Sequence, residues 1–337
     1  MSVLARLTVP LLPADYLGYV DPLNAARSPR ARVEAVVRET ADAATLVLRP
    51  GRGLAAHQPG QWVRVGVEVD GVLLWRSYSL TSVPRDPLLS ITVRAQGPVS
   101  RQLVRGTRPG SVLRVEGPQG EFVLPARVPG PLLLVAAGSG ITPLMSMLRT
   151  LARRRALDDV VVHHSGRTPD GVVFGTELRA LARAFPGLHL VEHHTAVGRR
   201  MTVADLPADW DRRDTWACGP AALLTTLESH WADHGDPALL RVERFQTAVA
   251  AEGTGGGAVT FARSGRRSDG AATLLAAGEE AGVLMPHGCR MGICHTCVVP
   301  LLSGQVRDVR TGAVQDTEGA LVQTCVSAAA GPVCLDV

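Results

Sequence analysis

The stretch PLLLVAAGSGITPLMSMLRTLARRRA, residues 131–156, starts with an apolar run, passes two glycines and continues with apolar residues at helical spacing. It predicts a buried strand, a tight turn and a helix. Further segments of strand and helix character alternate after it, at 159–165, 175–185, 188–194, 213–219, 220–235 and 239–245. Strands that alternate with helices indicate a parallel, doubly wound α/β sheet.

The sequence on either side of this α/β region has a different rhythm. Between about 32 and 116, short alternating segments separated by Gly and Pro predict six or so antiparallel strands of a small β-barrel or sandwich, interrupted by a short helix at 99–106. QTAVAAEGTGGGAV has the composition of a flexible linker, and a small α+β unit follows it. We therefore expect a multidomain chain: extension 1–30, antiparallel β-barrel 31–127, doubly wound domain 128–246, linker 247–256 and α+β domain 257–337.

Composition excludes several classes of function. Hydrophobic residues make up 46% and charged residues 20% of the 337 positions, as in folded globular proteins. All 35 basic residues are arginines, spread along a chain of net charge +4, which argues against a nucleic-acid partner. No apolar run approaches the ~18 residues of a membrane span, and the first 20 residues lack the pattern of an export signal. We expect a cytoplasmic protein without a transmembrane segment.

Three cysteines lie close together in PHGCRMGICHTC, residues 286–297. Cys289, Cys294 and Cys297 have the spacing CX4CX2C, and Cys325 follows later in the chain. This is the plant-type spacing of [2Fe-2S] ligands. A disulfide framework is disfavoured in a reducing cytoplasm, and zinc would normally require a second close pair of cysteines.

The residues between these cysteines suit the same metal centre. Gly288 and Gly292 permit a tight backbone wrap, because glycine adopts positive φ at little cost. Arg290 either adds positive potential beside an anionic cluster or is a surface arginine, and the sequence does not choose between the two. Cys334 is expected to be a small buried residue near the last strand.

The pattern CRMGICHTC with the distant QTC resembles the plant-type ferredoxin domain, a β-grasp fold, over residues 257–337. In the barrel, RSYSL at 76–80 resembles the flavin motif of the ferredoxin-NADP reductase superfamily. That resemblance implies that Arg76 pairs with flavin phosphate, Tyr78 stacks on the flavin, and Ser79 hydrogen-bonds near the reactive flavin N5. GPVSRQL at 97–103 resembles the phosphate turn, where the amides of Val99 and Ser100 suit an anion.

Two strand-to-helix turns of the α/β domain suit a dinucleotide. In GSGIT, Gly138 and Gly140 can bring backbone N–H groups against a pyrophosphate, and Thr142 begins the next helix. A glycine-rich turn without a ligand is the alternative for this stretch alone. In ACGP, the resemblance implies that Cys218 and Gly219 approach the nicotinamide. We therefore place Ser79 and Cys218 at the hydride-transfer site, with no acid or base role for Cys218.

The end of the second α/β strand, VVHHSGRTPD, bears on the choice of nucleotide. It carries Ser165 and Arg167 without an immediate carboxylate, which favours NADPH over NADH, because arginine accommodates a 2′-phosphate. Two histidine doublets, 163–164 and 193–194, lie at strand ends. Side chains of neighbouring residues on a strand point to opposite faces, so the two histidines of a doublet cannot point the same way. We also expect the two strands to be adjacent in sequence order only, so hydrogen-bonded or exposed histidines are favoured over a metal site.

Together these motifs predict one function. Nicotinamide delivers two electrons as hydride and a [2Fe-2S] cluster takes one, so a flavin must convert between them. The domain order resembles phthalate dioxygenase reductase, whereas residues 1–30 resemble actinobacterial reductases of acyl-CoA or fatty-acid desaturases. The second resemblance implies FAD and NADPH, and the first FMN and NADH. We follow the second, with Phe245 covering the flavin face and the linker letting the ferredoxin domain move.

The electron acceptor stays open between an oxygenase and a desaturase, which can itself be a membrane protein. The alternative enzyme is an NADH-dependent reductase component of a Rieske dioxygenase, a di-iron monooxygenase or a P450 system. A non-enzymatic alternative is an iron–sulfur redox sensor, although no DNA-binding or signalling module is visible. A carrier with degenerate flavin domains is disfavoured by the intact RSYSL, GPVS and GSG segments.

Overall fold

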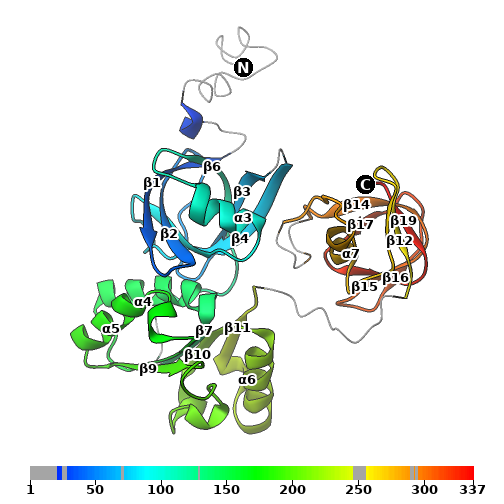
Figure 1. The fold of residues 1–337 in the computed structure, drawn as a ribbon. Helices are drawn as coiled ribbons and strands as arrows, with labels where there is room; N and C mark the ends of the chain where they lie inside the picture. The colour runs from blue at the N-terminus through cyan, green and yellow to red at the C-terminus, as the bar shows by residue number, and fades with distance from the viewer. Residues whose placement is uncertain are drawn as a thin grey trace, which may run out of the picture. The chain divides into compact units, whose positions relative to one another are not determined.

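The computed structural model describes residues 21–24, 29–69, 72–127, 130–245, 256–288, 292 and 295–337. The chain divides near position 245 into two compact units (Figure 1). The first contains an antiparallel barrel and an α/β domain, and the second contains a small α+β domain. The predicted linker lies outside the described residues apart from Gly256, and so does most of the predicted N-terminal extension.

Six strands form the barrel, as the alternating segments predicted. They are β1 (Arg30–Arg38), β2 (Ala43–Pro50), β3 (Trp62–Val69), β4 (Val72–Ser79), β5 (Leu89–Arg94) and β6 (Val112–Gln119). Their order is β4-β3-β6-β1-β2-β5. A bridge between Leu80 and Ile91 joins the two outer strands, so the sheet closes. Val63 and Val65 alternate into the closed interior and are fully buried.

Two short segments cap the barrel. Helix α3 (Pro98–Arg101) continues directly into a π-helical turn at Gln102–Gly106, which together correspond to the helix predicted at 99–106. From the N-terminal extension, the 3₁₀ turn η1 (Pro22–Asn24) reaches the turn after β2, where Arg52 N donates to Leu23 O at 2.8 Å. The described end of the extension is therefore attached to the barrel.

The α/β domain has five parallel strands with helices on both faces (Figure 1). Its strands are β7 (Leu132–Ala137), β8 (Val160–Gly166), β9 (Leu188–His194), β10 (Asp214–Cys218) and β11 (Leu240–Glu243). The order β11-β10-β7-β8-β9 is doubly wound, as predicted. Helices α4 (Ile141–Arg154) and α5 (Gly175–Ala184) share one apolar core with the sheet, and α6 (Ala221–His234) shares the other.

Helix α4 and strand β10 fasten the α/β domain to the barrel. Ser146 Oγ donates to Ser82 O at 2.7 Å, and Arg149 Nη1 donates to Thr81 O at 2.7 Å. The indole Nε1 of Trp216 donates to Val123 O at 3.2 Å. These hydrogen bonds satisfy polar groups that the junction buries, so a sliding motion would break several at once.

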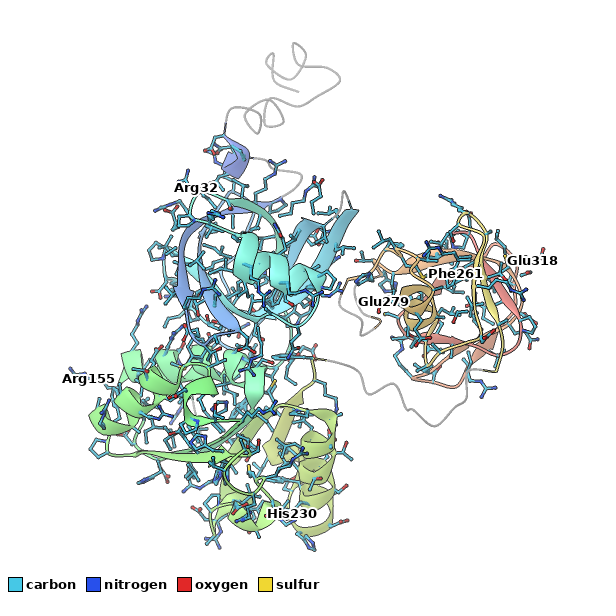
Figure 2. The ribbon with its side chains drawn as sticks, in the orientation of Figure 1. Arg32, Arg155, His230, Phe261, Glu279 and Glu318 are labelled. Carbon is cyan, nitrogen blue, oxygen red and sulfur yellow. The ribbon has the colours of Figure 1, made fainter. Side chains whose placement is uncertain are left out.

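The C-terminal domain is a β-grasp. One sheet has the order β13-β12-β19-β14-β17 and a smaller one the order β16-β15-β18. The bounds are β12 (Val259–Phe261), β13 (Arg266–Ser268), α7 (Leu274–Glu280), β14 (Val298–Ser303), β15 (Val306–Asp308), β16 (Val314–Gln315), β17 (Leu321–Gln323), β18 (Ser327–Ala329) and β19 (Val333–Leu335). Phe261, labelled in Figure 2, is fully buried in the core that α7 shares with the strands.

One feature of this domain was not predicted from the sequence, and another differs from the prediction. Residues 321–329 form two strands, β17 and β18, because a turn at 324–326 carries the chain from the β14 sheet to the β15 sheet. Thr324 holds the turn by donating from N and Oγ1 to Cys297 O, at 3.1 and 2.9 Å. Cys334, expected to be buried, is only partly buried in β19, where it pairs with Thr260.

Candidate hydride-transfer and electron-transfer sites

The predicted flavin strand is β4. Because side chains alternate along a strand, Arg76 and Tyr78 lie on one face and Ser77 and Ser79 on the other. Arg76 Nη1 donates to Trp75 O at 2.9 Å. Ser79 is buried and is the last residue of β4, directly before the bridge at Leu80 that closes the barrel. Ser79 is thus held at a rigid strand end, which suits a group that must meet a reactive atom.

The predicted phosphate turn begins at Gly97. Ser100 Oγ accepts hydrogen bonds from the N–H groups of Gln96 and Gly97, both at 2.9 Å, and donates to Gly97 O at 3.0 Å. Val99 is buried and anchors the turn. A Cβ placed on Gly97 would meet nothing within 4 Å. The side chain of Ser100 therefore orders the turn, and the open space beside Gly97 leaves room for an anion.

The glycine turn after β7 forms the 3₁₀ segment η3 (Gly138–Gly140). Gly138 has φ +57°, the left-handed region that favours glycine. A Cβ on Gly140 would lie 2.0 Å from Cys218 O, so only glycine fits this close approach. Thr142 Oγ1 donates to Ser139 O at 2.9 Å and closes the first turn of α4.

The turn after β10 is the partner in that contact. Strands β7 and β10 are paired, with Ala136 opposite Cys218, and a Cβ on Gly219 would come within 3.2 Å of Ala137 Cβ. The two strand-to-helix turns, predicted separately, therefore pack against each other. They meet where the strand order reverses between β10 and β7, which is where ligands bind in open α/β sheets.

The chemistry of this switch point is set by two buried groups. Burial raises the pKa of the fully buried Cys218 thiol well above its ordinary value, and the neighbouring Glu243 raises it further. Glu243, opposite Cys218 in β11, has its pKa raised to about 7 by burial. Cys218 is thus a neutral thiol at neutral pH.

The histidine doublets correct one step of the sequence argument. Strands β8 and β9 are paired neighbours, so the expectation that they adjoin only in sequence is wrong. Their pairing brings His163 Nδ1 to 3.1 Å from His193 Nε2. No group of three or more metal-ligand side chains occurs among the residues that the structure describes. His163 and His193 thus pair with each other, and His164 Nε2 lies near the backbone oxygen of Gly138.

One of these histidines supports the nucleotide turn. His164 Nε2 lies 3.3 Å from Gly138 O. Burial lowers the pKa of His164 to about 4, so at neutral pH its Nε2–H can donate to that carbonyl. Ser165 follows at the end of β8, and Arg167 is exposed just beyond it. Phe245 lies two residues after β11.

The described part of the predicted cluster site contains two of its four cysteines. Cys297 Sγ and Cys325 Sγ, both buried, lie 3.2 Å apart. That separation is too long for a disulfide of about 2.05 Å and short enough for two ligands of one iron. Cys289, Cys294 and Arg290 lie outside the described residues, so their roles stay predictions. The buried, converging sulfurs fit a [2Fe-2S] cluster.

Four residues that the fold brings to these sites were not predicted from the sequence: Arg94, Glu243, Arg310 and Gln323. Arg94 ends β5, donates to Gly171 O at 3.0 Å, and has its Nη1 4.0 Å from the Cβ position of Gly138. Arg310 and Gln323 contact the backbone of Gly292. Only Glu243 had a signal, its place at the end of a predicted strand of a parallel sheet.

Comparison with known proteins agrees with this arrangement. Three family profiles match in chain order: an oxidoreductase FAD-binding domain at 31–124, an oxidoreductase NAD-binding domain at 134–228 and a 2Fe-2S iron-sulfur cluster binding domain at 263–330. An NADPH oxidoreductase of Mycobacterium tuberculosis is 48% identical, over 100% of this chain and 91% of that protein. The chain belongs to the flavin and iron–sulfur oxidoreductases.

More distant relatives of this oxidoreductase share its whole architecture. The structure of phthalate dioxygenase reductase has a TM-score of 0.62 and 25% identity, covering 91% of this chain and 97% of that one. A glycine betaine monooxygenase reductase subunit of Chromohalobacter salexigens is 30% identical, over 86% of this chain and 90% of the relative. The oxidoreductase is NAD(P)H-dependent, and its cofactors are FAD and a [2Fe-2S] cluster.

No helix among the described residues is both long and apolar enough to cross a bilayer.

Proposed function

We propose that this oxidoreductase transfers electrons from NADPH through FAD to its own [2Fe-2S] cluster and then to an external oxygenase. The observation that carries the proposal is the contact between the Gly138–Gly140 turn and the Cys218–Gly219 turn at the switch point of a sheet fastened to the flavin barrel. The converging Cys297 and Cys325 provide the exit for single electrons.

The cofactors supply the redox chemistry: a nicotinamide gives hydride, a flavin takes it and releases single electrons, and a [2Fe-2S] cluster accepts one at a time. The chain supplies positions. The glycine turn and Cys218 would bind the nicotinamide, and Ser79 at the end of β4 would hydrogen-bond the flavin near its reactive atom. Arg76, Tyr78 and the amides of Val99 and Ser100 would hold the flavin phosphates and ring. Phe245 would cover a face of the flavin.

The preference for NADPH rests on the end of β8. Ser165 and Arg167 are available there for a 2′-phosphate. The acidic Glu192, opposite His164 on β9, is already engaged by Arg179 through two hydrogen bonds of 2.8 Å. A carboxylate held in this way is a poor partner for the ribose hydroxyls that mark NADH. The name of the Mycobacterium tuberculosis relative, an NADPH oxidoreductase, supports the same choice.

An anaerobic stopped-flow experiment tests the nucleotide preference. Flavin absorbance should bleach faster with NADPH than with NADH, and Arg167→Leu should lower that preference by roughly tenfold, the worth of one charge-assisted hydrogen bond. Arg183→Leu removes an exposed arginine from the last turn of α5 and is the matched control. Equal rates with both nucleotides in the unsubstituted protein would refute the NADPH preference.

The oxygenase acceptor is supported by the relatives. Curated relatives at 29–31% identity are reductase components of a stachydrine N-demethylase, glycine betaine monooxygenases and 3-ketosteroid-9-alpha-monooxygenases. A purified Rieske oxygenase from such a system should be reduced by the protein and NADPH. Cytochrome c serves as a control acceptor, because it reports electron exit without requiring specific docking.

A desaturase is the second candidate acceptor, because residues 1–30 resemble actinobacterial reductases of acyl-CoA or fatty-acid desaturases. The match with the Mycobacterium tuberculosis relative, named an NADPH oxidoreductase, covers 100% of the chain and so includes these residues. Deletion of residues 1–20 should leave cytochrome c reduction intact in either case. Loss of electron delivery to a desaturase but not to an oxygenase would assign the extension to a desaturase.

A further inference from the structure

Gly292 lies between Cys289 and Cys294 in the sequence, and two side chains from elsewhere in the domain bind its carbonyl oxygen. The carbonyl oxygen of Gly292 accepts hydrogen bonds from Arg310 Nη1 at 3.2 Å and from Gln323 Nε2 at 3.0 Å. Gln323 ends β17, and Arg310 follows β15. Two donors, one at the end of β17 and one in the turn after β15, therefore fix the orientation of the Gly292 carbonyl.

Both donors are themselves held in place. Asp308, the last residue of β15, accepts from Arg310 Nε at 3.1 Å and from Arg310 Nη2 at 2.6 Å. Arg310 Nη2 also lies 3.3 Å from Gln323 Oε1, and Gln323 Nε2 lies 3.0 Å from His295 Nδ1. Asp308, Arg310 and Gln323 thus form a hydrogen-bonded network that includes the carbonyl of Gly292.

The glycine at position 292 leaves room for the Arg310 side chain. Gly292 has φ +73°, and a Cβ there would fall 2.4 Å from Arg310 Nη1 and 2.9 Å from Val326 Cγ1. The guanidinium therefore lies directly on the glycine backbone. A larger residue at 292 would displace it, in addition to being strained by the positive φ.

Arg310 is also close to the cluster ligands. Its guanidinium binds the carbonyl of Gly292, two residues before Cys294 in the sequence, and the N–H of its neighbour Val309 donates to the carbonyl oxygen of Val326, next to Cys325, at 2.9 Å. The positive charge of Arg310 therefore interacts favourably with negative thiolates, in accord with its pKa, which the hydrogen bond to Asp308 raises and the charges of Cys325 and Cys297 raise further. Asp308 beside it offsets part of that charge. A cluster that gains negative charge on reduction is sensitive to both.

We propose that Arg310, braced by Asp308 and Gln323, is a positioning residue that fixes the backbone at Gly292 and biases the cluster toward its reduced state. Outer partners of metal ligands orient the ligands and tune the metal in this way. The proposal concerns the cluster alone and does not depend on the nucleotide preference or on the acceptor.

The test compares four variants of the full-length holoprotein. Arg310→Gln removes the guanidinium and its charge, Arg310→Lys keeps the charge without the planar donor set, and Asp308→Asn removes the brace. Arg307→Gln removes an equal charge from an exposed position of β15 and is the matched control. The measurements are the rate at which cluster absorbance is lost in the presence of an iron chelator, and the midpoint potential of the cluster by spectroelectrochemistry.

Arg310→Gln should lose its cluster roughly tenfold faster than the unsubstituted protein, as substitution of an outer metal partner generally does. Its reduced-to-oxidised ratio at a fixed potential should fall about fivefold, the effect of one water-screened charge. Asp308→Asn should also lose the cluster faster, but its potential should shift in the opposite direction. Arg310→Lys should keep the midpoint potential close to that of the unsubstituted protein, while its cluster should still be lost faster. Arg307→Gln should match the unsubstituted protein in both measurements.

Two results would overturn the proposal. One is an Arg310→Gln protein with unchanged retention and potential. The other is an equal effect of Arg307→Gln, which would make the change a general consequence of domain charge. If Arg310→Gln fails to fold, Gln323→Leu removes the second donor to Gly292 without changing any charge. The Gln323→Leu protein should then lose its cluster faster with little change of midpoint potential. An unchanged rate of cluster loss in that variant would equally reject the proposed role of the hydrogen bonds to Gly292.

Discussion

Replacing Gly140 with alanine tests whether the two turns at the switch point set the hydride-transfer geometry. Gly140 has ordinary helical backbone angles, φ −60° and ψ −12°, so alanine is conformationally allowed there. The added Cβ would lie 2.0 Å from Cys218 O and 2.5 Å from Cys218 C. Both are backbone atoms of a buried strand end, so no flexible side chain can move aside.

The size of the effect follows from that distance. Ordinary van der Waals contact begins near 3.4 Å, so the turns must separate by more than 1 Å. A misplacement of about 1 Å near reacting groups can lower a rate by roughly 10²-fold. Overpacking of a buried contact also costs about 1–3 kcal/mol of stability. We therefore expect Gly140→Ala to slow flavin reduction by NADPH roughly 100-fold with a moderate loss of folding free energy.

The assay separates this effect from general damage. Anaerobic stopped-flow absorbance follows flavin bleaching by NADPH, and dithionite titration shows whether flavin and cluster are still bound and reducible. Gly130→Ala is the control, because a Cβ at Gly130 meets nothing within 4 Å and lies in the same domain. Flavin reduction in Gly140→Ala at the unsubstituted rate, with NADPH affinity unchanged, would show that the turn contact does not set the geometry.

Three further substitutions probe buried polar groups of the same domain. Because burial raises the pKa of Glu243 from 4.5 to about 7, the free energy of unfolding should fall by on the order of 2 kcal/mol as pH rises across that range, and Glu243→Gln should flatten this slope in urea titrations. Arg213 lowers the pKa of Asp209, so the free energy of unfolding should decrease as pH falls below the ordinary carboxyl pKa. Arg213→Leu should lower the free energy of unfolding by roughly 1–3 kcal/mol at pH 7 and should reduce its further decrease in acid, as measured by urea unfolding at several pH values. Since burial keeps the Cys218 thiol protonated, the flavin reduction rate should be flat from pH 8 to 10, and a break near 9 that disappears in Cys218→Ala would contradict this.

The sequence predicted most of the fold because local pattern and global architecture agree. The apolar run before Gly138 and the helical spacing after it indicate β7 and α4 without ambiguity, and the alternating segments give each barrel strand. The segment at 320–327 was harder, because a chain that crosses from one sheet to another keeps its strand character on both sides of Thr324. The partners of Gly292 could not be predicted, since Arg310 and Gln323 reach it only through tertiary structure.

The same limit applied to the histidine doublets. Sequence places His163 and His193 on successive strands, but only the order of the sheet decides whether those strands are neighbours. In a doubly wound sheet the first three strands run outward in sequence order, so the second and third do pair. The pairing gives His163 and His193 each other as partners, and His164 lies against Gly138 O.

The composition of the switch point explains why geometry is the main variable there. Hydride transfer requires no proton from the protein. Cys218 is a neutral thiol, and Glu243, with its pKa raised to about 7, carries only part of a negative charge near pH 7. A full fixed charge would favour one redox state of the nicotinamide over the other, because the ring gains positive charge when it gives up hydride. With that charge reduced, the contact distance that Gly140 permits is the main contribution of these two turns.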